Sequence, residues 1–129
     1  MADISTQDDV VLLVDSFYDR VRNDNTIGPI FNNIIEDWSH HLPKMYRFWG
    51  TVLFGEPGYS GNTIATHIAI DKKFPLKEEH YASWIGLWKS TVDSLFAGEK
   101  AEEAKKRGML MIQLINFKVD DSHNKNFIQ

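Results

Sequence analysis

The length, composition and charge of this chain exclude several classes of protein. It has 129 residues, with 14 Lys and Arg, 18 Asp and Glu, and no Cys. We expect a single domain over residues 1–129 at this length. The lack of Cys excludes disulfides, thiolate metal sites and iron–sulfur clusters, so any metal must be held by His, Asp or Glu. The net charge of −4 offers no basic surface for nucleic acid or an anionic membrane, and neither is an expected partner.

The start of the chain and its hydropathy indicate a cytoplasmic protein. Residues 1–9 are acidic, whereas a secretory signal begins with basic residues. No apolar run approaches the roughly 20 residues that a membrane span needs. Charged residues at 25% and hydrophobic residues at 43% are ordinary values for a globular protein. We therefore expect a folded cytoplasmic domain.

An amphipathic helix is predicted in the first part of the chain. Four apolar residues repeat at steps of 4, 3 and 4, which is typical of one helix face: Val10, Val14, Phe17 and Val21. Ser5 and Thr6 are N-cap candidates, and the polar residues 23–25 end the helix near Arg22. The apolar stretch 30–35 that follows is expected to form a tight loop or a short helix.

A second helix is predicted around a run of aromatic and apolar residues. Its members keep helical steps of 3, 1 and 3: Met45, Phe48, Trp49 and Val52. We expect the chain to enter this helix through Pro43, because a first turn tolerates the missing N–H of proline. Residues 55–62 are a loop by composition, and residues 63–74 show a less regular pattern around His67.

Two further helices complete an all-α prediction. The first begins at Leu76 and carries a long helical pattern: Tyr81, Trp84, Ile85, Trp88, Val92, Leu95 and Phe96. Gly98 interrupts it, and a last helix begins near Glu99 and keeps its apolar face to Val119. The polar tail 120–129 is expected to be frayed and disordered. The sequence contains no alternating strand pattern and no internal repeat.

The histidines are the main candidates for chemistry, because the sequence lacks the usual motifs for nucleotide binding and hydrolysis. There are five of them: His40, His41, His67, His80 and His123. His67 lies in the apolar segment 64–70, where an unsatisfied imidazole would cost about 1–3 kcal/mol. Two interpretations stay open for it. The local sequence favours a core histidine bonded to a backbone carbonyl over a lone axial ligand to a planar metal cofactor.

Other polar groups near the apolar faces are candidates for a site. His40 and His41 are adjacent and point about 100° apart on a helix, so they do not form a two-His zinc site. Tyr18 and Trp84 lie on or beside apolar helix faces. Such aromatic residues are more often part of a core, but these two provide hydrogen-bond donors that would need a polar target in an apolar pocket.

Several short motifs occur in an order and spacing that resemble a known family. They are Phe17 to Arg22, Ile27 to Phe31, Trp38 to His41 followed by Phe48-Trp49, Gly55 through Tyr59 to Gly61, His67, and Phe74-Pro75 followed by His80 to Trp84. Over residues 8–119 this pattern resembles the truncated haemoglobins, and more specifically their third group. The Gly-Gly pairs typical of the first two groups are absent, in agreement with this placement.

The resemblance implies a truncated-globin fold, a 2-over-2 helical sandwich around a haem b that is bound non-covalently. By position, His67 matches the proximal ligand of the haem iron. Tyr18, His41 and Trp84 match the distal residues that face the gas ligand, and His40 would replace His41 if the register differs by one.

The resemblance also implies which residues surround the haem. Four of them are expected to line its cavity: Phe31, Met45, Phe48 and Trp49. Lys44 is the candidate partner of a haem propionate, and Arg47, Lys72 and Lys73 are alternative cations.

The function implied is reversible binding of O₂ and of other diatomic gases such as CO and NO. A first alternative is a haem enzyme that carries out NO dioxygenation or peroxide reduction; it would need an unknown reductase, and no catalytic residue is assigned to it. A second alternative is a helical interaction module that binds no haem and uses its Trp-rich face.

Overall fold

The structure is a computed structural model that describes residues 1–57 and 63–128, without the side chains of residues 63–65 and 123–128. The described ranges contain helices and no strand, so the predicted all-α class is confirmed. The helices are α1 (Gln7–Arg22), α2 (Gly28–Ile34), α3 (Trp38–Phe54), α4 (Thr63–Lys73), α5 (Glu78–Leu95) and α6 (Glu99–Ile128). None of these helices has both the length and the apolar composition of a membrane span.

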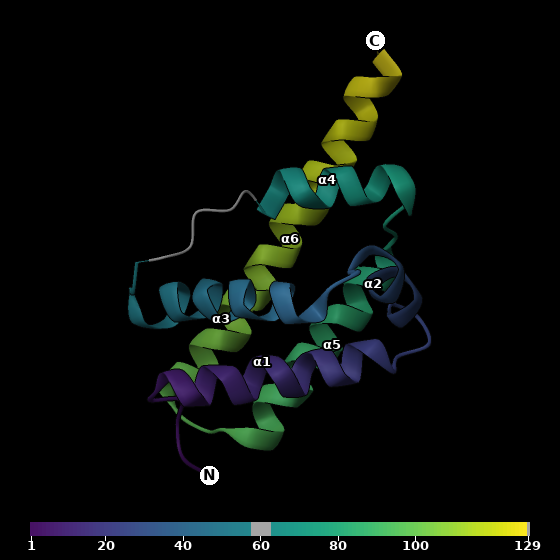
Figure 1. Cartoon of the computed structure of the whole chain (residues 1–129). Helices are drawn as coiled ribbons and strands as arrows, with labels where there is room; N and C mark the ends of the chain where they lie inside the picture. Colours follow the sequence, from purple (N-terminus) through teal and green to yellow (C-terminus); the bar gives the residue numbers. More distant parts are fainter. Residues whose placement is uncertain (58–62, 129) are drawn as a thin grey trace.

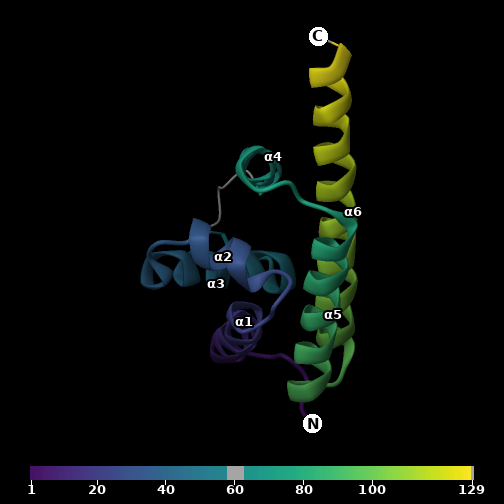
Figure 2. The same ribbon diagram turned by 90° about the vertical axis from the view of Figure 1, so that its right-hand side faces the viewer.

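The helices form two crossed layers. In one layer α1 and α3 lie side by side and run in opposite directions; in the other, α5 and α6 lie side by side and cross the first pair (Figures 1 and 2). The short α2 packs beside α1, and α4 lies across α6 on the far side of α3 from α1 (Figure 2). This arrangement is the predicted 2-over-2 sandwich.

The first helix has the predicted cap and the predicted buried face. The Thr6 hydroxyl accepts a hydrogen bond from the Asp9 N–H at 3.2 Å, and the Asp9 carboxylate accepts one from the Thr6 N–H at 3.1 Å. This reciprocal pair is a capping box, which satisfies two N–H groups at a helix start. The apolar side chains on one face of α1, from Val10 to Val21, are buried.

Helix α3 begins earlier than the sequence predicted. We expected entry through Pro43, but the helix starts at Trp38, and Pro43 lies inside it. The Asp37 carboxylate caps the start by accepting hydrogen bonds from the Ser39 N–H at 3.1 Å and the Ser39 hydroxyl at 2.6 Å. These hydrogen bonds allow the helix to begin at Trp38, more than one turn before Pro43. The helix lacks one backbone hydrogen bond at Pro43, because proline has no N–H. His40 and His41 therefore lie within the helix rather than before it.

Two other segments are more helical than expected. Residues 63–73, whose pattern looked irregular, form α4, which packs against α6. Helix α6 continues past Val119, its last buried core residue, to Ile128, across residues that we expected to be a frayed tail. Packing against α6 stabilises α4. Beyond Val119, α6 continues through the backbone hydrogen bonds of the helix itself. The predicted loop begins with Gly55 in the left-handed region, at a φ of 68°, and its residues 58–62 lie outside the described part.

The N-terminal segment caps the start of α6, a contact that no local pattern predicts. The Asp3 carboxylate accepts hydrogen bonds from the N–H groups of Lys100 at 2.9 Å and Ala101 at 2.8 Å. Burial would raise the pKa of Asp3, but these hydrogen bonds outweigh it and lower the pKa. A side chain at Gly98 would prevent this approach, since its Cβ would overlap the Asp3 side chain and the φ of residue 98 is +144°.

Stacked indoles fill the crossing point of the two layers. The ring of Trp88, fully buried in α5, stacks on Trp49 of α3 at a centroid distance of 4.3 Å and on Trp84 at 5.8 Å. Its indole N–H donates to the carbonyl of Ala104 in α6 at 2.8 Å. This approach requires Gly108, because a Cβ there would lie 2.6 Å from the Trp88 ring.

We predict that Gly108→Ala destabilises the protein by about 1–3 kcal/mol, because the added methyl group overlaps a ring that cannot move away. Gly86→Ala is the matched control: a Cβ at Gly86 in α5 meets nothing within 4 Å. That substitution should stabilise the chain by up to about 1 kcal/mol, since Ala is the better helix former. Urea unfolding of both variants measures the difference, and equal effects would contradict this account of the Trp88 contact.

Candidate functional site

A large cavity lies between the helices and is lined by side chains from all six of them. Its volume is about 700 Å³. Every residue that the sequence assigned to a site lies on its wall: Tyr18, Phe31, His41, Lys44, Met45, Phe48, Trp49, His67 and Trp84. The predicted site residues, which are far apart in the sequence, are therefore brought together around one space.

Tyr18 and His41 form a polar pair on the α1 and α3 side of the cavity. Tyr18 is buried, His41 is half-buried, and the Tyr18 hydroxyl lies 3.4 Å from the His41 Nε2. Their rings meet edge to face at a centroid distance of 5.4 Å. This geometry distinguishes the two adjacent histidines, because His41 meets Tyr18 while His40 is exposed at the opening.

The environment of His41 favours its neutral form. Burial lowers the pKa of His41 below the ordinary 6.5, and the nearby positive charges of Lys44 and His40 lower the pKa further. At pH 7 the imidazole is therefore uncharged, and its ring has one N–H donor and one acceptor nitrogen. A neutral His41 can accept a hydrogen bond from Tyr18 or donate one into the cavity.

Trp84 lies on the cavity wall as part of the indole stack. The ring is buried, it stacks on Trp88, and it meets Phe17 edge to face at a centroid distance of 5.1 Å. Its N–H makes no hydrogen bond with any residue in the described part of the chain. Trp84 is thus a rigidly held donor beside an apolar space.

His67 lines the cavity from α4. The side chain is half-buried, and α4 is held in place by its packing against α6. Tyr18, His41 and Trp84 belong to helices α1, α3 and α5. The single histidine from α4 and the polar groups of the other helices therefore share one cavity. Among the described residues, no three His, Asp or Glu side chains are grouped as a protein-only metal site would require.

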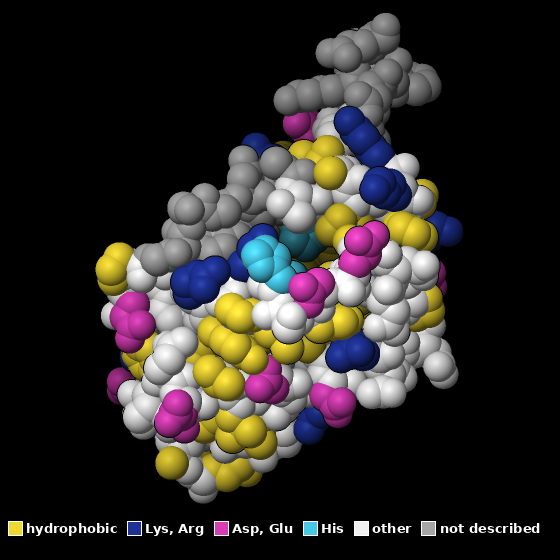
Figure 3. Space-filling view, viewed as in Figure 1, with side chains coloured by type: hydrophobic (Ala, Val, Ile, Leu, Met, Phe, Trp, Pro, Cys, Tyr) yellow, Lys and Arg dark blue, Asp and Glu magenta, His cyan; other side chains and the backbone are white. Residues whose placement is uncertain are grey.

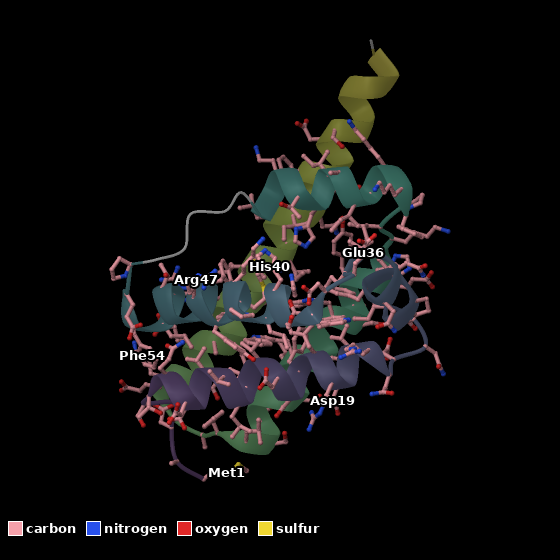
Figure 4. The ribbon with its side chains drawn as sticks, viewed as in Figure 1. Met1, Asp19, Glu36, His40, Arg47 and Phe54 are labelled. Carbon is pink, nitrogen blue, oxygen red and sulfur yellow. The ribbon has the colours of Figure 1, made fainter. Side chains whose placement is uncertain are left out.

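The opening of the cavity carries both cationic and acidic side chains. His40, Lys44 and Arg47 lie at steps of 4 and 3 on α3, and all three are exposed and line the cavity. Figure 4 shows His40 and Arg47 on the edge of α3 that faces α4, with Glu36 just before the helix. In the space-filling view, a hollow on this face lies beside histidine side chains, with Lys and Arg on one side and acidic groups on the other (Figure 3). The alternative cations Lys72 and Lys73 are exposed on α4 but do not line the cavity.

Two cavity residues at the start of α5, His80 and Tyr81, have no predicted role. The His80 Nδ1 accepts a hydrogen bond from the Lys77 N–H at 2.9 Å, and the side chain reaches the wall. Tyr81 is buried, and its hydroxyl has no hydrogen-bond partner within the described chain. Burial, followed by the charge of Asp71, raises the pKa of Tyr81 to about 12. A signal existed for Tyr81, because it precedes Trp84 by three positions and so shares its helix face.

The wall also includes Met111 and Ile112 of α6. The sequence pattern placed them on the apolar face of the last helix, where core packing is the ordinary expectation. Local spacing does not tell whether an apolar side chain touches another side chain or a cavity, so these two residues could be recognised only from the fold.

Comparisons with known proteins agree with this fold. The chain is 29% identical over 109 residues to the group 3 truncated haemoglobin ctb of Campylobacter jejuni, which covers 81% of this chain and 84% of that protein. The crystal structure of a group III truncated haemoglobin from Campylobacter jejuni superposes with a TM-score of 0.83 at 27% identity, over 92% of this chain and 95% of that one. The chain resembles the group III truncated haemoglobins.

A second solved structure shares the fold of this truncated-haemoglobin relative. The 2/2 haemoglobin of Synechococcus sp. PCC 7002, solved in the cyanomet state with covalently attached haem, superposes with a TM-score of 0.72 over 89% of this chain and 92% of that one. Its identity of 17% makes this a likeness of fold alone. No protein-family model matches the sequence.

We predict that His41 titrates below pH 6.5 in an NMR experiment, because burial and neighbouring cations disfavour its charged form. The unfolded chain then binds the proton more tightly than the folded one, so the stability that His41 contributes is lost as the pH falls below about 6.5. Urea unfolding at pH 7 and at pH 5 should show a smaller acid loss for His41→Gln than for the unchanged chain. A His41 pKa above 6.5 would contradict this description of its environment.

Proposed function

We propose that the cavity binds haem b non-covalently through its iron and that the protein in this form reversibly binds O₂, CO and NO. The observation that carries the proposal is the joint position of His67, Tyr18 and His41 on the wall of one large cavity. The resemblance to group III truncated haemoglobins supports it. When bound through one protein ligand, haem iron would supply a coordination position for a diatomic gas.

The residues of the cavity fit such a group. A volume of about 700 Å³ lies within the usual range of about 300–1,000 Å³ for cofactor sites. Phe31, Met45 and Phe48 provide apolar wall for a porphyrin, and His67 provides an imidazole ligand for its iron. The absence of Cys excludes attachment through a thioether bond.

The cations at the opening suit the charged edge of the cofactor. Haem b carries two carboxylates, and charge-assisted hydrogen bonds hold such groups at a protein surface. Lys44 and Arg47 both line the opening and are one helical turn apart on α3. We assign the propionates to this pair, rather than to Lys72 or Lys73.

The donors on the wall suit a bound gas. O₂ bound to a ferrous haem here would carry partial negative charge, which hydrogen-bond donors would stabilise. The Tyr18 hydroxyl and the Trp84 N–H are the donors that we assign to this role, with the neutral His41 paired to Tyr18. In this assignment the neutral His41 carries its proton on Nε2 and donates it to the Tyr18 oxygen, so that the Tyr18 O–H points its one proton to the gas. Tyr18 and Trp84 then slow gas release.

We predict that His67→Ala abolishes haem retention, because the variant lacks the imidazole that would bind the iron. Purified protein is titrated with haemin, and the Soret band and its shift with CO are recorded. His80→Ala is the matched control, since His80 also lines the cavity but is assigned no iron ligand role, and it should retain haem. Extraction with acidified acetone should remove the haem from the unchanged chain, because no covalent bond holds it.

The outcomes separate the proposal from its alternatives. Unchanged protein that takes up no haemin would contradict haem binding and favour a helical interaction module. Haem retention by His67→Ala together with loss in His80→Ala would move the ligand role to His80. Haem that stays with the protein after extraction would contradict non-covalent binding.

We predict that Tyr18→Phe raises the O₂ dissociation rate by up to about tenfold. One buried hydrogen bond contributes about 0.5–1.5 kcal/mol, and a tenfold change in rate corresponds to about 1.4 kcal/mol. Stopped-flow displacement of O₂ by CO measures the rate. Tyr46→Phe is the control, because the Tyr46 hydroxyl donates to Asp15 and the residue does not line the cavity. Equal rates for Tyr18→Phe and the unchanged chain would remove Tyr18 from the distal role.

A further inference from the structure

Exposed large hydrophobic side chains gather on one face of α6. Leu110, Leu114 and Phe117 are 50%, 48% and 65% exposed. They follow one another at steps of 4 and 3, so they lie on one side of the helix. We call these three residues the outer stripe. In the rest of the described chain, only Met1 and Leu12 are exposed large hydrophobics.

The outer stripe faces away from the rest of the fold. The residues that α6 buries in the core, among them Ile112 and Val119, lie on the opposite side of the helix, which packs against α3, α4 and α5. The helices thus cover one side of α6 and leave the stripe in solvent. Apolar residues grouped in this way are typical of an interaction site, whereas single exposed ones are ordinary.

A positive and a negative side chain lie at equal distances along α6 on either side of Leu114, the middle residue of the outer stripe. Arg107 lies seven positions before Leu114, and Asp121 lies seven positions after it. Seven residues complete almost two turns, so both charged residues share the face of the stripe. The Arg107 side chain is 58% exposed, and its nearest carboxylate is that of Glu103 at 3.9 Å.

We propose that the outer stripe is the interface of a homodimer in which α6 of one copy packs antiparallel on α6 of a second copy about Leu114. A two-fold axis at Leu114 places Arg107 of each copy opposite Asp121 of the other, so the charge match occurs twice. A parallel pair would instead place Arg107 on Arg107 and Asp121 on Asp121, which costs energy. The charges therefore select both a second copy as the occupant and its direction.

The size of the surface sets the strength of the association. From Arg107 to Asp121 the helix extends about 21 Å, at about 1.5 Å per residue. A contact between two single helix faces of this length is smaller than the roughly 1,200–2,000 Å² interfaces of stable complexes. We expect a weak dimer, with a dissociation constant of roughly 10–100 μM.

Sedimentation velocity of the full chain from about 10 μM to 1 mM tests the proposal. The sedimentation coefficient should rise with concentration in the unchanged chain. Leu114→Lys places two positive charges face to face at the axis and should weaken association at least tenfold. Leu12→Lys is the matched control, because Leu12 is also 48% exposed but lies on α1, and it should leave association unchanged.

Charge reversal gives a second test that does not depend on the apolar residues. Arg107→Asp alone, or Asp121→Arg alone, creates two like-charged pairs and should weaken association about three- to tenfold. The double variant restores opposite charges across the axis and should recover the affinity. Circular dichroism of each variant checks that α6 is retained.

Spin labels report the direction of the helices, and the lack of native Cys allows a single labelling site. A label on Lys106→Cys lies eight residues from the axis, so antiparallel helices separate two labels by about 24 Å along their length. Parallel helices would place the labels side by side. A chain that stays monomeric at 1 mM, a dimer that Leu114→Lys leaves intact, or labels side by side would each overturn the proposal.

Discussion

The contact between Trp88 and the backbone of α6 is the constraint on which the structure depends. The Trp88 indole lies against Gly108 and donates to the Ala104 carbonyl at 2.8 Å, which fixes the distance between α5 and α6. The same ring stacks on Trp49 of α3 and meets Phe17 of α1 edge to face at 5.0 Å. One side chain therefore joins both layers, and only a glycine at position 108 allows it to approach.

The cavity follows from this packing. Trp49 and Trp84 both stack on Trp88 and both line the cavity. Bulky aromatic rings hold the layers apart where they cross, and α4 covers the space above them from its position on α6. The helices thus enclose a large internal space with largely aromatic and apolar walls. Tyr18 and His41 are among the polar groups in these walls.

The parts of the fold and site that have a local signal could be predicted from the sequence. The apolar face of α1 and its Thr6 cap were predicted because helix periodicity and capping depend on neighbouring residues. The start of α3 was predicted wrongly at Pro43, because the prediction rested on the proline alone and did not consider Asp37 as a cap. The Asp3 cap on α6 joins residues about a hundred positions apart. That the Tyr81 hydroxyl has no hydrogen-bond partner among the described residues is visible only once its surroundings are known.

The sequence by itself determined that the chain is helical, that it has no thiolate ligand, and that His67, Tyr18 and Trp84 are polar groups beside apolar helix faces. Periodicity and composition suffice for these points, because they depend on residues within a few turns of one another. Only the tertiary structure decided that these groups share one cavity, that His41 rather than His40 meets Tyr18, and that α6 leaves an apolar stripe in solvent. Each of these depends on how helices cross, and contacts between distant residues set that crossing.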